Sequence, residues 1–224
     1  MASRHAIVNP IVLLVLLCGD VAFMLLHVSN RLVPRNPLFS LAVDGGYSEF
    51  FQYFKECSTA LLFFVMGWRT RDVLLTAWAL LFTYLFFDDA MTIHESMGRV
   101  IAARWQFIPT FGIRAADFGE LVVSAIAGAV FLVLIGGLYL RGSENGKSVS
   151  RDLTVLLAVL VFFGVVVDAV HLAIQEQQVH GLTVLEDSGE MVAMSLIASY
   201  AVRRWQQPAA GAGLLWRLTV ERRL

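Results

Sequence analysis

Long apolar stretches alternate with short polar segments along the chain. Six of these stretches contain about 20 mostly apolar residues, the length that an α-helix needs to cross the roughly 30 Å hydrocarbon core of a bilayer. The strict alternation of apolar and polar residues that marks β-strands is absent. The pattern predicts an all-α integral membrane bundle of six transmembrane helices, with spans at 7–28, 47–67, 73–95, 117–140, 153–175 and 185–202.

The composition supports a membrane-embedded chain. Hydrophobic residues make up 58% of the 224 residues and charged residues 16%, against about 45–50% and 25% in soluble domains. This balance excludes a disordered protein and a nucleic-acid-binding module. Two cysteines without a CxxC pair exclude a disulfide scaffold and a thiol redox motif. We expect one domain over residues 1–224.

The charges are distributed unevenly between the two ends of the predicted spans. Eleven of the 17 Lys and Arg residues fall on the side that holds both termini, which the positive-inside rule places in the cytoplasm. The bundle is therefore predicted to be N-in/C-in. Residues 203–224 form a cytoplasmic tail, for which an interfacial helix and a frayed terminus are both open. Fourteen of the 18 Asp and Glu residues fall on the opposite side.

Several of these acids lie inside the apolar spans, accompanied by histidines. Residues three, four or seven positions apart share a helix face, so Asp88, Thr92 and Glu95 are predicted to align in the third span. Ionisable groups in a bilayer normally face the bundle interior or water. We therefore expect a carboxylate and histidine pocket that faces the periplasm or exterior. Acids at helix ends, such as Glu186, have an alternative explanation in the helix dipole and in exposure to the interface.

Carboxylates combined with imidazoles are typical ligands of zinc, manganese and iron. We therefore predict a divalent-metal site. The candidate metal ligands are Glu56, Asp88, His94, Glu95, Glu120, Asp168, His171 and Glu190. The residues expected to support them by hydrogen bonding are Asp89, Thr92, Gln175 and Glu186. No nucleotide or flavin motif accompanies them, and no catalytic residue is assigned.

Three functional classes use such a pocket. The leading hypothesis is a metal-binding protein, including a metalloenzyme that acts on a lipid-soluble substrate. A proton- or cation-coupled transporter is the first alternative, although the inner halves of the spans are almost uniformly apolar. A non-catalytic subunit of a larger membrane complex is the second. Membrane lipids, membrane-protein partners and a second copy of the chain are the expected partners, and nucleic acid is not.

Two short segments carry a resemblance to known sequences. Asp88-Asp89 is followed after four residues by His94-Glu95 at the end of a span, and Glu186-Asp187 and Glu190 open a later span. This arrangement resembles uncharacterised bacterial multi-pass inner-membrane proteins. The resemblance implies a location in the bacterial inner membrane, and it implies no activity.

Overall fold

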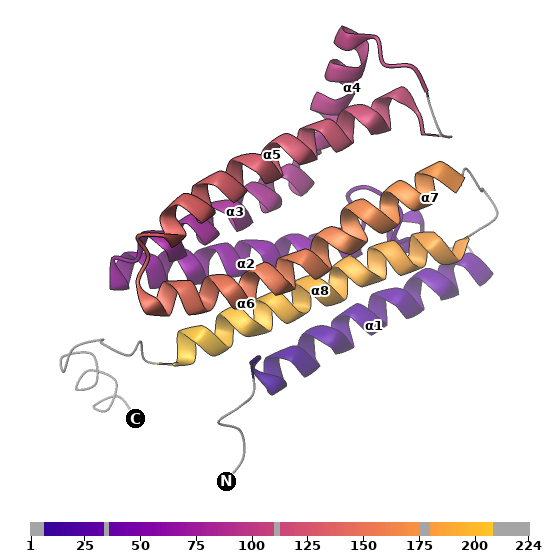
Figure 1. The fold of residues 1–224 in the computed structure, drawn as a ribbon. Helices are drawn as coiled ribbons and strands as arrows, with labels where there is room; N and C mark the ends of the chain where they lie inside the picture. Colours follow the sequence, from indigo (N-terminus) through magenta and orange to yellow (C-terminus); the bar gives the residue numbers. More distant parts are fainter. Residues whose placement is uncertain (1–6, 34–35, 110–112, 175–179, 208–224) are drawn as a thin grey trace.

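The computed structural model describes residues 7–33, 36–109, 113–174 and 180–207, and these residues form helices and no β-strand (Figure 1). The all-α prediction is confirmed for this part of the chain. In chain order the elements are α1 (Pro10–Leu32), the 3-10 turn η1 (Pro37–Phe39), α2 (Tyr47–Thr70), α3 (Val73–Ala90), α4 (Ile93–Trp105), α5 (Ala115–Tyr139), α6 (Glu144–Val161), the π-helical segment η2 (Phe162–Val167), α7 (Asp168–Ile174) and α8 (His180–Gln206).

Four of the described helices are long and apolar enough to cross a membrane. They are α1, α3, α5 and the continuous helix Glu144–Leu172, which joins α6, η2 and the first part of α7. The other long helices, α2 and α8, have 24 and 27 residues. Their length suffices for a span, but Lys55 and Glu56 in α2 and the acids at the start of α8 interrupt their apolar character.

The predicted third span, 73–95, consists of two helices instead of one. Helix α3 ends at Ala90 and α4 begins at Ile93, because Thr92 adopts a left-handed conformation with φ 46°. A β-branched residue rarely adopts this conformation, which ends a right-handed helix. The predicted link from residue 96 to residue 116 is therefore partly helical, since α4 continues to Trp105.

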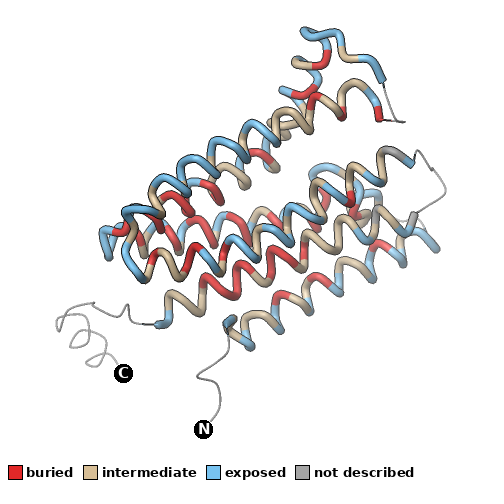
Figure 2. Tube along the Cα trace, viewed as in Figure 1, coloured by how far each residue is buried: buried red, intermediate tan, exposed pale blue. Residues whose placement is uncertain are grey.

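The apolar core lies at one end of the bundle, between α2, α3, α6 and α8. Figure 2 shows the buried segments on the facing sides of these helices. Trp78 and Phe82 of α3 pack there with Phe63 of α2, Leu153 of α6 and Ile197 of α8. Trp78 also donates a hydrogen bond from Nε1 to Ser150 Oγ at 2.7 Å. This packing holds α2, α3, α6 and α8 against one another.

The two ends of the bundle differ in charge, and we name them accordingly. The basic end is where α1 begins and α8 ends (Figure 1), and it carries Arg69, Arg141, Arg203 and Arg204. There Asn9 Nδ2 donates to Gln206 Oε1 at 2.8 Å, which joins the start of α1 to the end of α8. The acidic end is where α3 ends and α8 begins. Most of the predicted tail, residues 208–224, lies outside the described residues.

Candidate functional site

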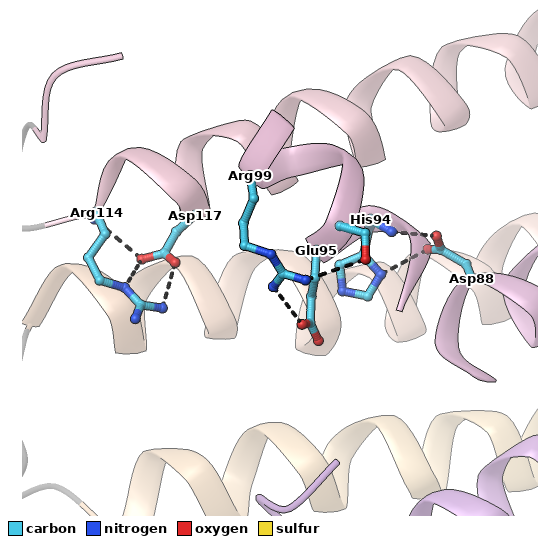
Figure 3. A network of polar contacts seen from close by, with 7 residues as sticks. Asp88, His94, Glu95, Arg99, Arg114 and Asp117 are labelled. Carbon is cyan, nitrogen blue, oxygen red and sulfur yellow. Dashed lines mark hydrogen bonds and ion pairs between the residues drawn. The ribbon is translucent and has the colours of Figure 1, made fainter. Parts of the chain in front are cut away.

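The junction between α3 and α4 brings an aspartate and a histidine together at the acidic end. Asp88 Oδ1 accepts a hydrogen bond from the His94 backbone N–H at 3.0 Å, and Asp88 Oδ2 lies 3.1 Å from His94 Nδ1 (Figure 3). The first backbone N–H groups of a helix have no partner within it, so Asp88 caps α4. This contact holds the His94 imidazole beside the end of α3.

His94 lies beyond the membrane-spanning helix α3. Its hydrogen bond with Asp88 raises the pKa of the His94 imidazole above its ordinary value. A carboxylate that accepts from one ring nitrogen also fixes the orientation and the tautomer of the imidazole ring.

Asp89 completes a group of three possible metal ligands. One ligand atom each from Asp88, Asp89 and His94 lies within 4.8 Å of the others. The carboxyl group of Asp89 also lies within hydrogen-bonding distance of Glu56 on α2. Because neighbouring carboxylates repel each other, this arrangement favours a proton or a cation between them. We call Asp88, Asp89, His94 and Glu56 the α3–α4 cluster.

A second group of acids and a histidine lies on α7 and α8. His171 Nδ1 is 2.8 Å from Glu186 Oε2. Glu186 and Asp168 lie within hydrogen-bonding distance of each other through their carboxyl groups. Asp168 in turn interacts electrostatically with His94. This second group therefore lies within electrostatic range of the α3–α4 cluster.

Two predicted ligands have other neighbours. Glu95 Oε2 forms an ion pair with Arg99 at 3.3 Å, one turn along α4, so its carboxylate is neutralised locally (Figure 3). Glu120 lies on α5 against Gly98, within electrostatic range of His94 and Asp168. Glu120 thus lies near both groups of acids and histidines, but it is not one of the three residues, Asp88, Asp89 and His94, whose ligand atoms approach one another. At the start of α5, Arg114 and Asp117 form a two-point ion pair at 2.7 and 3.0 Å.

The predicted supporting residues also have different surroundings. Asp89 belongs to the ligand set itself, and Glu186 binds His171, as described above. The side chain of Thr92 forms no capping hydrogen bond, and the residue acts through its backbone at the junction of α3 and α4. Gln175 lies outside the described residues. The remaining predicted ligand, Glu190, lies on α8 within electrostatic range of Asp89.

A buried ion pair near the middle of α1 was missed by the sequence analysis. Lys55 Nζ lies 3.0 Å from Asp20 Oδ1, and both side chains are 0% exposed. Lys55 also donates to the Met191 carbonyl at 2.8 Å and to Ser195 Oγ at 3.3 Å, while Ser195 donates to Asp20 Oδ2 at 2.6 Å. A lysine within an apolar span is itself unusual, which is the signal that could have identified it.

Comparisons with known proteins assign the chain to a family without adding an activity. No curated protein and no solved structure matches the chain. A family model described as a domain of unknown function, DUF8692, matches residues 11–204. This range runs from the start of α1 to the end of α8 and includes all the acids and histidines described above. The chain therefore belongs to the DUF8692 family.

Proposed function

We propose that the chain is a six-helix membrane protein of the bacterial inner membrane with both termini in the cytoplasm. Helices α2 and α8 join the four apolar helices as spans. Their length supports this proposal, as does the burial of their charges: Lys55 is 1% exposed and Glu56 is 2% exposed. Ionisable groups are tolerated in a membrane when they face the bundle interior. The positive-inside rule assigns the basic end to the cytoplasm and the acidic end to the periplasm.

The function that the geometry supports best is the binding of a divalent metal ion at the acidic end. The observation that carries this proposal is the approach of ligand atoms from Asp88, Asp89 and His94 to within 4.8 Å of one another. Two carboxylates and an imidazole suit zinc, manganese or iron(II). A cation there would also neutralise the negative charge that Glu56 and Glu190 add nearby. A bound metal would supply a Lewis acid for a lipid-soluble substrate at the outer leaflet.

The metal content of the purified protein tests this proposal. The protein is purified in detergent without added metal, and zinc, manganese and iron are measured by mass spectrometry. We expect about one equivalent or more in the wild type. We expect the His94→Ala variant to lose the metal of the α3–α4 cluster. Glu144→Gln is the matched control, because Glu144 is an acid at the basic end with a 92% exposed side chain.

Two outcomes would overturn metal binding at this place. One is a wild-type protein that holds no metal even after reconstitution with each of the three ions. The other is a His94→Ala variant that is folded, as judged by circular dichroism and gel filtration, and retains the wild-type metal content. Loss of metal from Glu144→Gln as well would show that the ion is bound elsewhere.

Proton- or cation-coupled transport is the second candidate, and the Lys55–Asp20 pair favours it. The pair lies roughly halfway along α1 and extends the buried charges beyond the acidic end. Intramembrane ion pairs often mark proton and ion pathways. We expect a flux in proteoliposomes that is lost in Asp168→Asn and in Asp20→Asn. If the wild-type protein binds metal but shows no flux of protons or cations in proteoliposomes, transport is excluded as its function.

A further inference from the structure

The Lys55–Asp20 pair fixes three helices at one level of the bundle. Lys55 Nζ on α2 lies 3.0 Å from Asp20 Oδ1 on α1 and 3.3 Å from Ser195 Oγ on α8. Ser195 in turn donates to Asp20 Oδ2 at 2.6 Å. Because each side chain contacts the other two, the three residues form one polar layer across α1, α2 and α8. We call Asp20, Lys55 and Ser195 the central layer.

The same three helices carry a second polar layer nearer the acidic end. Residues seven positions apart on an α-helix lie on nearly the same face, about 10 Å apart along its axis. Seven positions from the central layer toward the acidic end, each helix has a polar residue: His27 on α1, Ser48 on α2 and Ser188 on α8. We call these three residues the acidic-end layer.

Contacts on both sides of the central layer support this register. The hydrogen bond between Asn9 and Gln206 at the basic end has the same spacing from the central layer on α1 as on α8, so one antiparallel register relates these two helices. Between the two layers, the ring centroids of Phe23 on α1 and Phe51 on α2 lie 5.5 Å apart. These contacts place the residues of the acidic-end layer at one level, as those of the central layer are.

The polar atoms of the acidic-end layer are enclosed by the protein. His27 is 4% exposed and Ser48 is 6% exposed. His27 Nε2, Ser48 Oγ and Ser188 Oγ are buried and have no hydrogen-bond partner among the described residues. The backbone N–H of Leu41 donates to His27 Nδ1 at 3.0 Å, so Nδ1 carries no proton and Nε2 carries it. The layer therefore offers one N–H donor and two hydroxyl groups.

Two further groups extend this set on either side. Gln52 lies one turn of α2 from each layer, and Asp187 precedes Ser188 on α8. Gln52 Oε1 and Asp187 Oδ2 are also buried without a hydrogen-bond partner in the described part of the chain. Buried polar groups without partners are costly, and proteins commonly satisfy such groups with ordered water. Donors, acceptors and hydroxyl groups in succession are what a chain of water molecules requires.

We propose that these groups hold a chain of ordered water molecules that leads from the acidic end to the Lys55–Asp20 pair, and that protons and small cations reach the pair by this path. The path ends at the central layer, because Phe63 of α2 and Ile197 of α8 beyond it belong to the apolar core. It does not depend on the proposed metal binding, and it gives the second candidate, transport, a route from the acidic end.

Cysteines placed along α8 test the path with Ag⁺, a cation of about the size of a water molecule that binds thiolates. Cys18→Ser and Cys57→Ser first remove the two exposed thiols. Ser188→Cys then places a thiol in the acidic-end layer, and Ser195→Cys places one in the central layer. The rate of silver–thiolate formation is followed by absorbance on the full-length protein in detergent.

Ser199→Cys is the matched control, one turn beyond the central layer on the same helix. Ser199 is 0% exposed, and its hydroxyl donates to the Leu196 carbonyl of its own helix at 2.9 Å. We expect the thiols at positions 188 and 195 to react at least about tenfold faster than the thiol at position 199, since reaction requires access to the thiolate.

A variant on α2 closes the path between the layers. Gln52→Leu replaces the polar link with an apolar side chain, so the reaction of Ser195→Cys should slow at least about tenfold while that of Ser188→Cys is retained. Thr59→Val is the control, because the Thr59 hydroxyl donates to the Lys55 carbonyl at 2.8 Å on the far side of the pair. We expect it to leave both rates unchanged.

The results distinguish the path from transport. Folded Ser188→Cys and Ser48→Cys variants that react no faster than Ser199→Cys overturn the path, and these two variants decide the matter should Ser195→Cys not fold. A reactive thiol at position 188 with a folded but unreactive one at position 195 overturns the connection to the pair. Reactive thiols without a flux in proteoliposomes support the path and exclude transport, whereas a flux without reactive thiols supports transport and overturns the path.

Discussion

At the scale of single residues, the Lys55–Asp20 ion pair connects three helices in the interior of the bundle. Both charges are fully buried, and their hydrogen bonds to Ser195 and to the Met191 carbonyl link α1, α2 and α8. Desolvation of two charges offsets much of their attraction, so such a pair adds little net stability compared with apolar residues. Removal of one partner is different, because it leaves the other charge buried and uncompensated.

We expect Asp20→Asn to lower the free energy of unfolding by about 3–5 kcal/mol, since Lys55 loses its counter-charge. The double variant Asp20→Leu/Lys55→Met should recover most of this loss. Thermal unfolding in detergent measures both. The control is Asp44→Asn, which removes an exposed acid. If the double variant were as unstable as Asp20→Asn, the loss of stability would not come from the uncompensated charge of Lys55.

The candidate metal ligands at the junction of α3 and α4 could be predicted only in part. The acids and His94 were identified from their positions in an apolar span. A continuous helix over 73–95 would align Asp88 with Glu95 and turn Asp89 aside. The left-handed Thr92 breaks that helix, which places Asp89 with His94 and turns Glu95 toward Arg99. A single left-handed residue is not visible in hydrophobic periodicity, so the exchange of Glu95 for Asp89 could not be predicted.

Thr92 itself gives a second prediction. A left-handed conformation costs a residue with a Cβ atom roughly 1–2 kcal/mol, and glycine avoids this cost. We expect Thr92→Gly to raise the free energy of unfolding by up to about 1 kcal/mol, after the greater flexibility of glycine in the unfolded chain is deducted. Thr92→Ala should give no gain, because alanine keeps the Cβ atom. Equal effects of the two substitutions in thermal unfolding would argue that the side chain, and not the backbone, matters.

At the scale of helices, α4 and α5 cross at two glycines. A methyl group on Gly98 would lie 2.6 Å from the backbone nitrogen of Glu120, and one on Gly119 would overlap the Gly98 backbone. The close approach sets the position of α4, which carries His94 in its first turn. The crossing of α4 and α5 at Gly98 therefore helps to fix the position of His94, a proposed metal ligand one turn earlier in α4.

We expect Gly119→Ala to destabilise the protein by about 1–3 kcal/mol, because the backbones must separate. It should also weaken metal binding, because α4 moves with His94. Gly128→Ala is the control on the same helix, where a methyl group meets no atom within 4 Å; it should be neutral or slightly stabilising, since alanine favours helices. Thermal unfolding and metal content would be measured on both. If Gly119→Ala were as stable as Gly128→Ala and held as much metal, the close approach of α4 and α5 would not have the predicted role in stability and metal binding.

The helices themselves were more predictable than the junctions between them. The first predicted span, 7–28, overlaps most of α1 at Pro10–Leu32, since about 20 apolar residues permit few alternatives. The first three residues of α4 were predicted as the end of the third span, 73–95, and the rest as the link that follows it; with 13 residues α4 is too short for a span of its own. Helix α6 begins before the predicted 153, where Ser143 caps its first turn. Ends depend on local hydrogen bonds, which apolar composition does not encode.

At the scale of the whole molecule, the two ends of the bundle differ in charge and in packing. The basic end contains the apolar core and joins the starts and ends of the helices through contacts such as Asn9–Gln206 and Arg204–Asn145. The acidic end contains the candidate metal ligands. Because the two ends are so different, the orientation in the membrane would determine which compartment reaches the proposed metal site.

Labelling of single cysteines tests that orientation. In a background with Cys18→Ser and Cys57→Ser, both exposed thiols are removed. Glu144→Cys then places a thiol at the basic end and Asp44→Cys at the acidic end, each at an exposed position. With a membrane-impermeant maleimide on intact cells, we expect Asp44→Cys to react and Glu144→Cys to react only after lysis, because the positive-inside rule keeps the basic end in the cytoplasm. The reverse pattern would place the candidate metal ligands on the cytoplasmic side, where a lipid-soluble substrate would have to come from the inner leaflet.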